Sequence, residues 1–129
     1  MKNKRAYWIA AASAVAAFCG TSPFAAAQKY PTKTVRFVVP FGAGGPADLY
    51  ARFLAQRLQE SLGQSFLVED RPGAGSIIGT DVVAKSAPDG YTLLVMSNTH
   101  TVNESLVSKK PFTLMKDFVP IAPINDGMR

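Results

Sequence analysis

The chain contains few of the residues that most often carry catalysis or bind metals. Among its 129 residues there is one cysteine, Cys19, and one histidine, His100. One cysteine cannot form a disulfide within the chain, and one histidine cannot by itself build a metal site. A nucleophile elbow of the form G-x-S-x-G is also missing. We therefore expect neither enzymatic activity nor a bound metal or cofactor.

The first 27 residues have the three parts of a secretory signal peptide. Three basic residues precede an apolar run over residues 6–18, and three alanines, residues 25–27, precede Gln28. The apolar run is shorter than the roughly 20 residues of a membrane-spanning helix, which argues against a permanent anchor. We expect cleavage after Ala27 and export from the cytoplasm.

Removal of this segment changes the composition of the protein. The whole chain carries a net charge of +5, but three of its 14 basic residues and its only cysteine lie in residues 1–27. Eleven basic and nine acidic residues remain, so the net charge falls to +2. This small excess does not indicate a nucleic-acid partner. The remaining 102 residues are enough for one modest core but not for two domains.

The first part of the mature chain has the pattern of a strand, a glycine-rich turn and a helix. Residues 35–39 are β-branched or aromatic and predict a strand, and residues 41–46 form the turn. Apolar residues at helical spacing over residues 47–62, from Leu49 and Phe53 onward, predict an amphipathic helix. Gly45 as cap, Pro46 at the first helical position and Gly63 beyond the end support these bounds.

The same pattern follows a second time. Residues 66–68 predict a short strand, residues 70–75 a second glycine-rich turn, and Ser76 caps a helix that reaches about residue 87. The apolar run over residues 91–96 predicts a strand covered by helices on both faces. Alternating strands and helices predict an α/β fold with a parallel sheet.

The last third of the chain gives weaker signals. It contains a polar loop over residues 97–101, a helical turn near residues 102–107 and an apolar tail over residues 118–124 in which a fourth strand could begin. Three parallel strands make a thin sheet with an open edge. We therefore expect residues 28–129 to be part of a larger domain, that is, a fragment.

The turn over residues 40–48 is the best candidate for a binding site. Its glycines let backbone amides approach a ligand, and the following helix presents its unpaired first amides, an arrangement that suits an anion. Asp48 is interpreted either as an acid that stabilises the start of the helix or as a ligand-facing group. His100 follows a strand and is either solvated or bonded to the backbone, or it lines the same site.

A dinucleotide site is the rival hypothesis. Gly42, Gly44 and Ala47 fit the motif G-x-G-x-x-G/A, and Glu69 lies where a ribose-binding acid would follow. Pro46 in the first helical turn and the export signal argue against it. The motif G-x-x-x-x-G-K-S/T is missing, which excludes a triphosphate-binding loop of that kind.

Four motifs in succession resemble a known family. They are Tyr30-Pro31, the segment VVPFGAGGPAD at residues 38–48, the segment EDRPGAG at residues 69–75, and the segment APDGYTLL at residues 87–94. Over about residues 29–123 the chain resembles the Bug family, the periplasmic solute receptors of bacterial tripartite tricarboxylate transporters.

The resemblance implies a fold like that of type II periplasmic binding proteins, with residues 28–129 as a partial N-terminal lobe. It implies a periplasmic, monomeric receptor that captures a small carboxylate, such as a di- or tricarboxylate, an acidic amino acid or an aromatic acid, and delivers it to the membrane permease. The residues that match the family's ligand-binding segments are Phe41, Ala43, Gly44, Gly45 and Asp48, followed by Ser97, Asn98, Thr99 and His100.

Family members are two to three times as long, so the opposite wall of the cleft is not in this sequence. We expect this chain to bind carboxylates weakly or not at all, because binding pockets usually bury about 70 to 90% of a ligand. Two alternatives stay open at this point: an exported α/β nucleotide-dependent oxidoreductase domain, and a nonfunctional remnant that does not fold stably.

Overall fold

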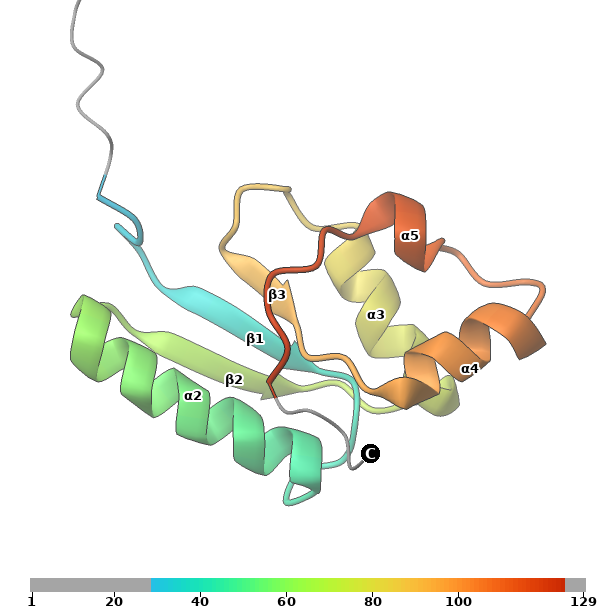
Figure 1. The fold of residues 1–129 in the computed structure, drawn as a ribbon, viewed down its shortest axis with the longest axis horizontal. Helices are drawn as coiled ribbons and strands as arrows, with labels where there is room; N and C mark the ends of the chain where they lie inside the picture. The colour runs from blue at the N-terminus through green and yellow to red at the C-terminus, as the bar shows by residue number, and fades with distance from the viewer. Residues whose placement is uncertain (1–28, 125–129) are drawn as a thin grey trace, which may run out of the picture.

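The computed structural model describes residues 29–124, so the predicted signal peptide and its cleavage point lie outside the described residues. Three parallel strands form one sheet in the order β2-β1-β3, with α2 on one face and α3 on the other (Figure 1). The elements are β1 (Val35–Val39), α2 (Pro46–Leu62), β2 (Phe66–Asp70), the 3-10 turn η1 (Ala74–Ser76), α3 (Ile77–Ala84), β3 (Thr92–Leu94), α4 (Asn98–Leu106) and α5 (Leu114–Asp117). The prediction of an α/β fold with a parallel sheet is confirmed.

The order of the strands determines where loops gather. The chain leaves the central strand β1 through α2 to β2 on one side, and then crosses through α3 to β3 on the other side. All three carboxyl ends therefore lie at the same edge, and the direction of winding reverses between β1 and β3. In open α/β sheets, ligands bind at such a reversal point.

The helix α2 begins and ends as predicted. Pro46 occupies the first helical position after the N-cap Gly45, and Gly63 adopts a left-handed conformation with φ of 70°. The Gly63 amide donates to the carbonyl oxygen of Gln59 at 3.0 Å, which closes the last turn. The predicted buried face of α2 is wrong in part, because Leu49 and Phe53 are 61% and 57% exposed.

Small residues on α2 account for that difference. Ala51 and Ala55 are buried against the sheet, and Leu54 and Leu58 pack beside them. The bulky apolar groups of this core come instead from the strands, where the rings of Phe37 and Phe66 lie 5.7 Å apart. The helix therefore approaches the sheet on its alanines, which turns Leu49 and Phe53 toward solvent.

The first unit is β1, its glycine turn and α2, and the second unit runs from β2 through α3 to β3. The second unit differs more from its prediction. The helix α3 ends at Ala84, and η1 precedes it. Ser76 forms no side-chain cap, because its φ of 79° is left-handed. The strand β3 covers only Thr92–Leu94, and its side chains are half-buried, so the prediction of a longer strand buried on both faces is wrong.

Residues 97–101 do not form the predicted loop. Ser97 is the N-cap of α4, and its hydroxyl accepts a bond from the Thr99 amide at 3.3 Å. Reciprocally, the Ser97 amide donates to His100 Nδ1 at 3.1 Å, so the histidine takes the place of the usual glutamate in a capping box. The helix α5 was not predicted, and residues 118–124 form no strand.

No helix among residues 29–124 is long and apolar enough to cross a membrane.

Candidate functional site

The structure brings the two predicted ligand-binding segments together at the carboxyl ends of β1 and β3. Residues 40–48 follow β1, and residues 97–100 follow β3, its neighbour in the sheet. The rings of Phe41 and His100 lie edge to face, with centroids 5.7 Å apart and an interplanar angle of 81°. The two segments are therefore in contact at the reversal point of the sheet.

The turn over residues 40–48 holds two of its amides by internal bonds and leaves two others without an acceptor in the described part of the chain. The Gly45 amide donates to the Gly42 carbonyl oxygen at 3.3 Å, and the Gly44 amide donates to Asp48 Oδ2 at 2.7 Å. Gly44 has a left-handed φ of 79°. Within residues 29–124, the amides of Ala47 and Asp48 in the first turn of α2 meet no acceptor. Unpaired amides in the first turn of a helix suit an anion.

Asp48 is buried, with an exposed fraction of 2%. Its Oδ2 atom accepts the Gly44 bond, and its Oδ1 atom lies 2.7 Å from Nε of Arg52. The Gly44 amide and, secondly, the Arg52 guanidinium lower the pKa of Asp48 below its usual value. Oδ2 thus accepts a hydrogen bond within the chain, and Oδ1 has an ion-pair partner but accepts no hydrogen bond of good geometry from residues 29–124, as an acid that closes the turn could do. A direct bond from Asp48 to a ligand stays a prediction.

His100 is also buried, with an exposed fraction of 2%, so it is not solvated. Its Nδ1 atom accepts the Ser97 amide, and its Nε2 atom lies 3.1 Å from Oγ1 of Thr80. Because the Thr80 hydroxyl donates its proton to the Ser76 carbonyl oxygen at 2.8 Å, it can only accept from the histidine. This network assigns the proton to Nε2. Burial lowers the pKa of His100, which favours the neutral ring.

The other predicted ligand-binding residues are more accessible. Ala43, Gly44 and Asn98 are exposed, whereas four others are half-buried: Phe41, Gly45, Ser97 and Thr99. Exposed and half-buried groups therefore surround the turn amides, while Asp48 and His100 lie beneath them. The role of each residue toward a ligand stays a prediction.

Sequence reasoning did not single out three polar residues that support these segments. Arg52 contacts Asp48, Thr80 contacts His100, and Asn103 donates to the Gly75 carbonyl oxygen at 2.6 Å. The spacing of four residues between Asp48 and Arg52 could have indicated the first contact. Nothing local marks the contact of Thr80 with His100 or that of Asn103 with Gly75, because the two residues of each pair are 20 or more positions apart.

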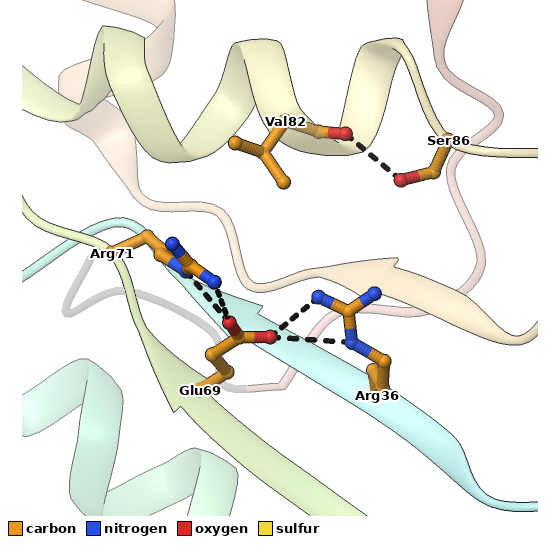
Figure 2. A network of polar contacts seen from close by, with 5 residues as sticks. All are labelled: Arg36, Glu69, Arg71, Val82 and Ser86. Carbon is orange, nitrogen blue, oxygen red and sulfur yellow. Dashed lines mark hydrogen bonds and ion pairs between the residues drawn. The ribbon is translucent and has the colours of Figure 1, made fainter.

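Glu69 does not have the surroundings expected of a ribose-binding acid. One of its oxygens accepts from Arg36 on β1, with Oε2 2.5 Å from Nη2, and the other accepts from Arg71 (Figure 2). The two arginines lower the pKa of Glu69, the larger effect coming from Arg36. Both oxygens are therefore paired with arginines, one on the neighbouring strand and one directly after β2. This pairing weakens the dinucleotide hypothesis. No cluster of three or more metal-ligating side chains is found in residues 29–124.

The open parallel sheet, with amide-rich turns gathered at one edge, has the architecture of a lobe of a periplasmic binding protein. The chain matches the tripartite tricarboxylate transporter family receptor, TctC, over residues 50–128. It belongs to this family, and the predicted resemblance is confirmed.

Individual relatives agree with this assignment. The chain is 45% identical to protein BugT of Bordetella pertussis over 114 residues, which are 84% of this chain and 35% of that protein. It is 43% identical to a UPF0065 protein of Bordetella bronchiseptica over 103 residues, which are 79% of this chain and 31% of that protein. The chain therefore spans about a third of the length of these relatives.

Solved structures confirm the predicted fold. The structure is similar to MatC from Rhodopseudomonas palustris with bound malate, with 40% identity and a TM-score of 0.66 over 70% of this chain and 31% of that one. It is also similar to a periplasmic transporter, with 37% identity and a TM-score of 0.61 over 65% of this chain and 29% of that one.

Proposed function

We propose that the edge formed by residues 40–48 and 97–100 binds the carboxylate of a small organic acid. The observation that carries this proposal is the glycine turn, whose Ala47 and Asp48 amides meet no acceptor within residues 29–124. These amides begin the 17-residue helix α2, whose dipole favours a negative charge at this end. Neutral backbone donors can bind a carboxylate without a long side chain to immobilise.

A dicarboxylate such as malate is the ligand we test first. MatC, which shares 40% identity with this chain, holds bound malate. The turn over residues 40–48 contains no lysine or arginine, and its exposed part is small and uncharged. The ligand would therefore be selected by amide geometry at one end and by Asn98 and Thr99 beside it.

The chain would act as a receptor and not as an enzyme. In this proposal residues 1–27 direct export to the periplasm, where the monomeric receptor passes its ligand to the membrane permease of a tripartite transporter. The three-part leader in the sequence and the family of receptors to which the chain belongs support this role.

The test is an NMR titration of the ¹⁵N-labelled chain with malate. We expect shifts concentrated at residues 42–48 and 97–100, with weak, millimolar affinity, because one wall leaves much of the ligand in water. The neutral diamide of malic acid is the matched ligand control and should cause no such shifts. Malate shifts spread evenly over the molecule would contradict the proposed site, and tight stoichiometric binding in a calorimeter would contradict the expected weakness.

A pair of variants at Ala43 tests the charge of the ligand. Ala43 is exposed within the turn, so substitution there should leave the fold intact. Ala43→Asp places a negative charge beside the amides and should abolish the malate shifts by repulsion. Ala43→Asn has nearly the same shape without the charge and should retain most of the affinity. Equal loss in both variants would indicate a steric effect and count against anion binding.

A further inference from the structure

Arg52 joins two acidic residues that lie at the ends of different elements. Its Nε atom is 2.7 Å from Oδ1 of Asp48 in the first turn of α2. Its Nη2 atom is 2.9 Å from Oδ2 of Asp70, the last residue of β2. Because Asp48 also accepts from the Gly44 amide at 2.7 Å, a continuous series of three polar contacts runs from the end of β2 to the glycine turn.

The burial of the two carboxylates shows why a cation is needed there. The exposed fractions are 3% for the Asp48 side chain, 16% for that of Asp70 and 52% for that of Arg52. A buried carboxylate without a partner is costly and tends to take up a proton. Two uncompensated carboxylates beneath the turn would also repel an anionic ligand, whereas Arg52 reduces their joint charge from −2 to −1.

We infer that Arg52 is a positioning residue of the carboxylate site, acting on the ligand through Asp48 and Gly44 and not by direct contact. By holding Asp48 ionised and oriented, it keeps the Gly44 amide turned toward Asp48. The neighbouring amides then remain directed at the anion. This inference rests on the proposed function of the turn.

The same helix provides a matched control. Arg57 lies one turn and a half further along α2 and pairs with Glu60 at 3.2 Å, with exposed fractions of 65% and 51%. It has no contact with the glycine turn among those found in residues 29–124. If Arg52 served only as one more surface ion pair, Arg52→Gln and Arg57→Gln would have similar small effects.

The test measures the Gly44 amide resonance as a function of pH and malate concentration. The Gly44 N–H donates directly to Asp48, so its shift reports the ionisation of that carboxyl group. We expect Arg52→Gln to move this titration to higher pH and to weaken malate binding about fivefold. Arg57→Gln should change neither the pH at which the Gly44 resonance titrates nor the affinity for malate. Arg52→Lys, which keeps the charge, should lie between wild type and Arg52→Gln, and it replaces the glutamine variant if that variant fails to fold.

The outcomes separate the inference from the proposed function. An unchanged Gly44 titration and unchanged malate affinity in Arg52→Gln would overturn the inference. A moved titration with unchanged affinity would overturn the effect on ligand binding and leave Arg52 a support of the turn alone. If malate leaves the wild-type turn unperturbed while the Gly44 titration still depends on Arg52, the proposed carboxylate site is overturned and the contact series is confirmed as structural.

Discussion

The two glycine-rich turns that follow β1 and β2 look alike in sequence but differ in backbone and surroundings. In the first turn, residues 40–48, Gly44 is the one residue with positive φ. In the second turn, residues 71–76, four residues in a row have positive φ: Gly73, Ala74, Gly75 and Ser76. Two of these four carry a side chain, so the second backbone is the more strained one.

Their contacts differ in the same sense. The Gly75 carbonyl oxygen in the second turn accepts from Asn103 on α4, and Ser76 is buried. In the first turn, the Gly44 amide instead donates to Asp48, in the first turn of the helix that follows. A strand, a glycine turn and a helix can thus form a turn closed by its own helix or a turn tied to another helix. Packing from other elements decides between the two.

Gly79 on α3 lies against residues of both turns. Its replacement should lower the free energy of unfolding more than any other change considered below. A Cβ atom on Gly79 would lie 2.6 Å from the Arg71 carbonyl oxygen and 2.7 Å from Cβ of Pro40. These neighbours belong to backbone or to a rigid ring, so they cannot yield easily. We expect Gly79→Ala to lower the free energy of unfolding by about 3 kcal/mol, measured by urea denaturation. Gly42→Ala, at a site with open space, is the control and should stay within about 0.5 kcal/mol.

His100 links the second unit to the first, since it bonds Thr80 on α3 and packs against Phe41. Its folded-state pKa is lowered by burial, so the unfolded chain binds the proton more readily. Stability should therefore be complete above the unfolded pKa of about 6.5 and fall as the pH drops below it, with a slope of up to about 1.4 kcal/mol per pH unit. The fall ends once the pH has passed the lowered folded-state pKa.

The control for this prediction is His100→Gln, which keeps a polar group but does not titrate. The variant should lose the pH dependence of stability just below pH ~6.5, whatever its absolute stability. Asp48, Glu69 and Asp89 also have lowered pKa values, but their stabilisation is lost only as the pH falls below about 4. A wild-type protein whose unfolding free energy is constant between pH 7 and pH 5 would contradict the lowered pKa of His100 in the folded state.

Replacement of Gly44 tests whether the stability of the first turn depends on its single residue with a left-handed conformation. Gly44 and Gly42 both have open space where a Cβ atom would be added, but only Gly44 has a positive φ. We therefore expect Gly44→Ala to destabilise the fold by about 1 kcal/mol, and Gly42→Ala to be neutral or slightly stabilising. Equal effects in chemical denaturation would show that the conformation of Gly44 is not required.

Local sequence signals predicted the first unit well and the second unit less well. For α2, the cap Gly45, Pro46 and Gly63 all act through the neighbouring backbone, so their positions are readable from the chain itself. At Ser76, by contrast, the hydroxyl does not cap the helix but accepts from Asn103, which lies 27 residues further along the chain. That partner cannot be identified from spacing alone.

The candidate site also contains one part that local sequence signals predicted and another that they did not. The turn over residues 40–48 was predicted from its glycines and the helix that follows. The helical start at Ser97 was read as a loop, because a histidine at the third helical position is not the usual partner of a capping box. The register of β1 with β3, which brings Phe41 to His100, is set by the fold as a whole.

Ala74 provides the finest test of the difference between the turns, with the smallest expected effect. Its φ of 47° is left-handed, which costs a residue with a Cβ atom about 1 to 2 kcal/mol. Ala74→Gly removes this cost but gives the unfolded chain more freedom, worth about 0.4 to 1 kcal/mol in the opposite direction. We expect a net gain in unfolding free energy of a few tenths of a kcal/mol up to about 1 kcal/mol. Ala43→Gly in the first turn, where φ is not positive, relieves no strain and should destabilise by about 0.4 to 1 kcal/mol. Opposite signs in these two variants would confirm that the second turn stores strain that the first lacks, and a loss in both would refute it.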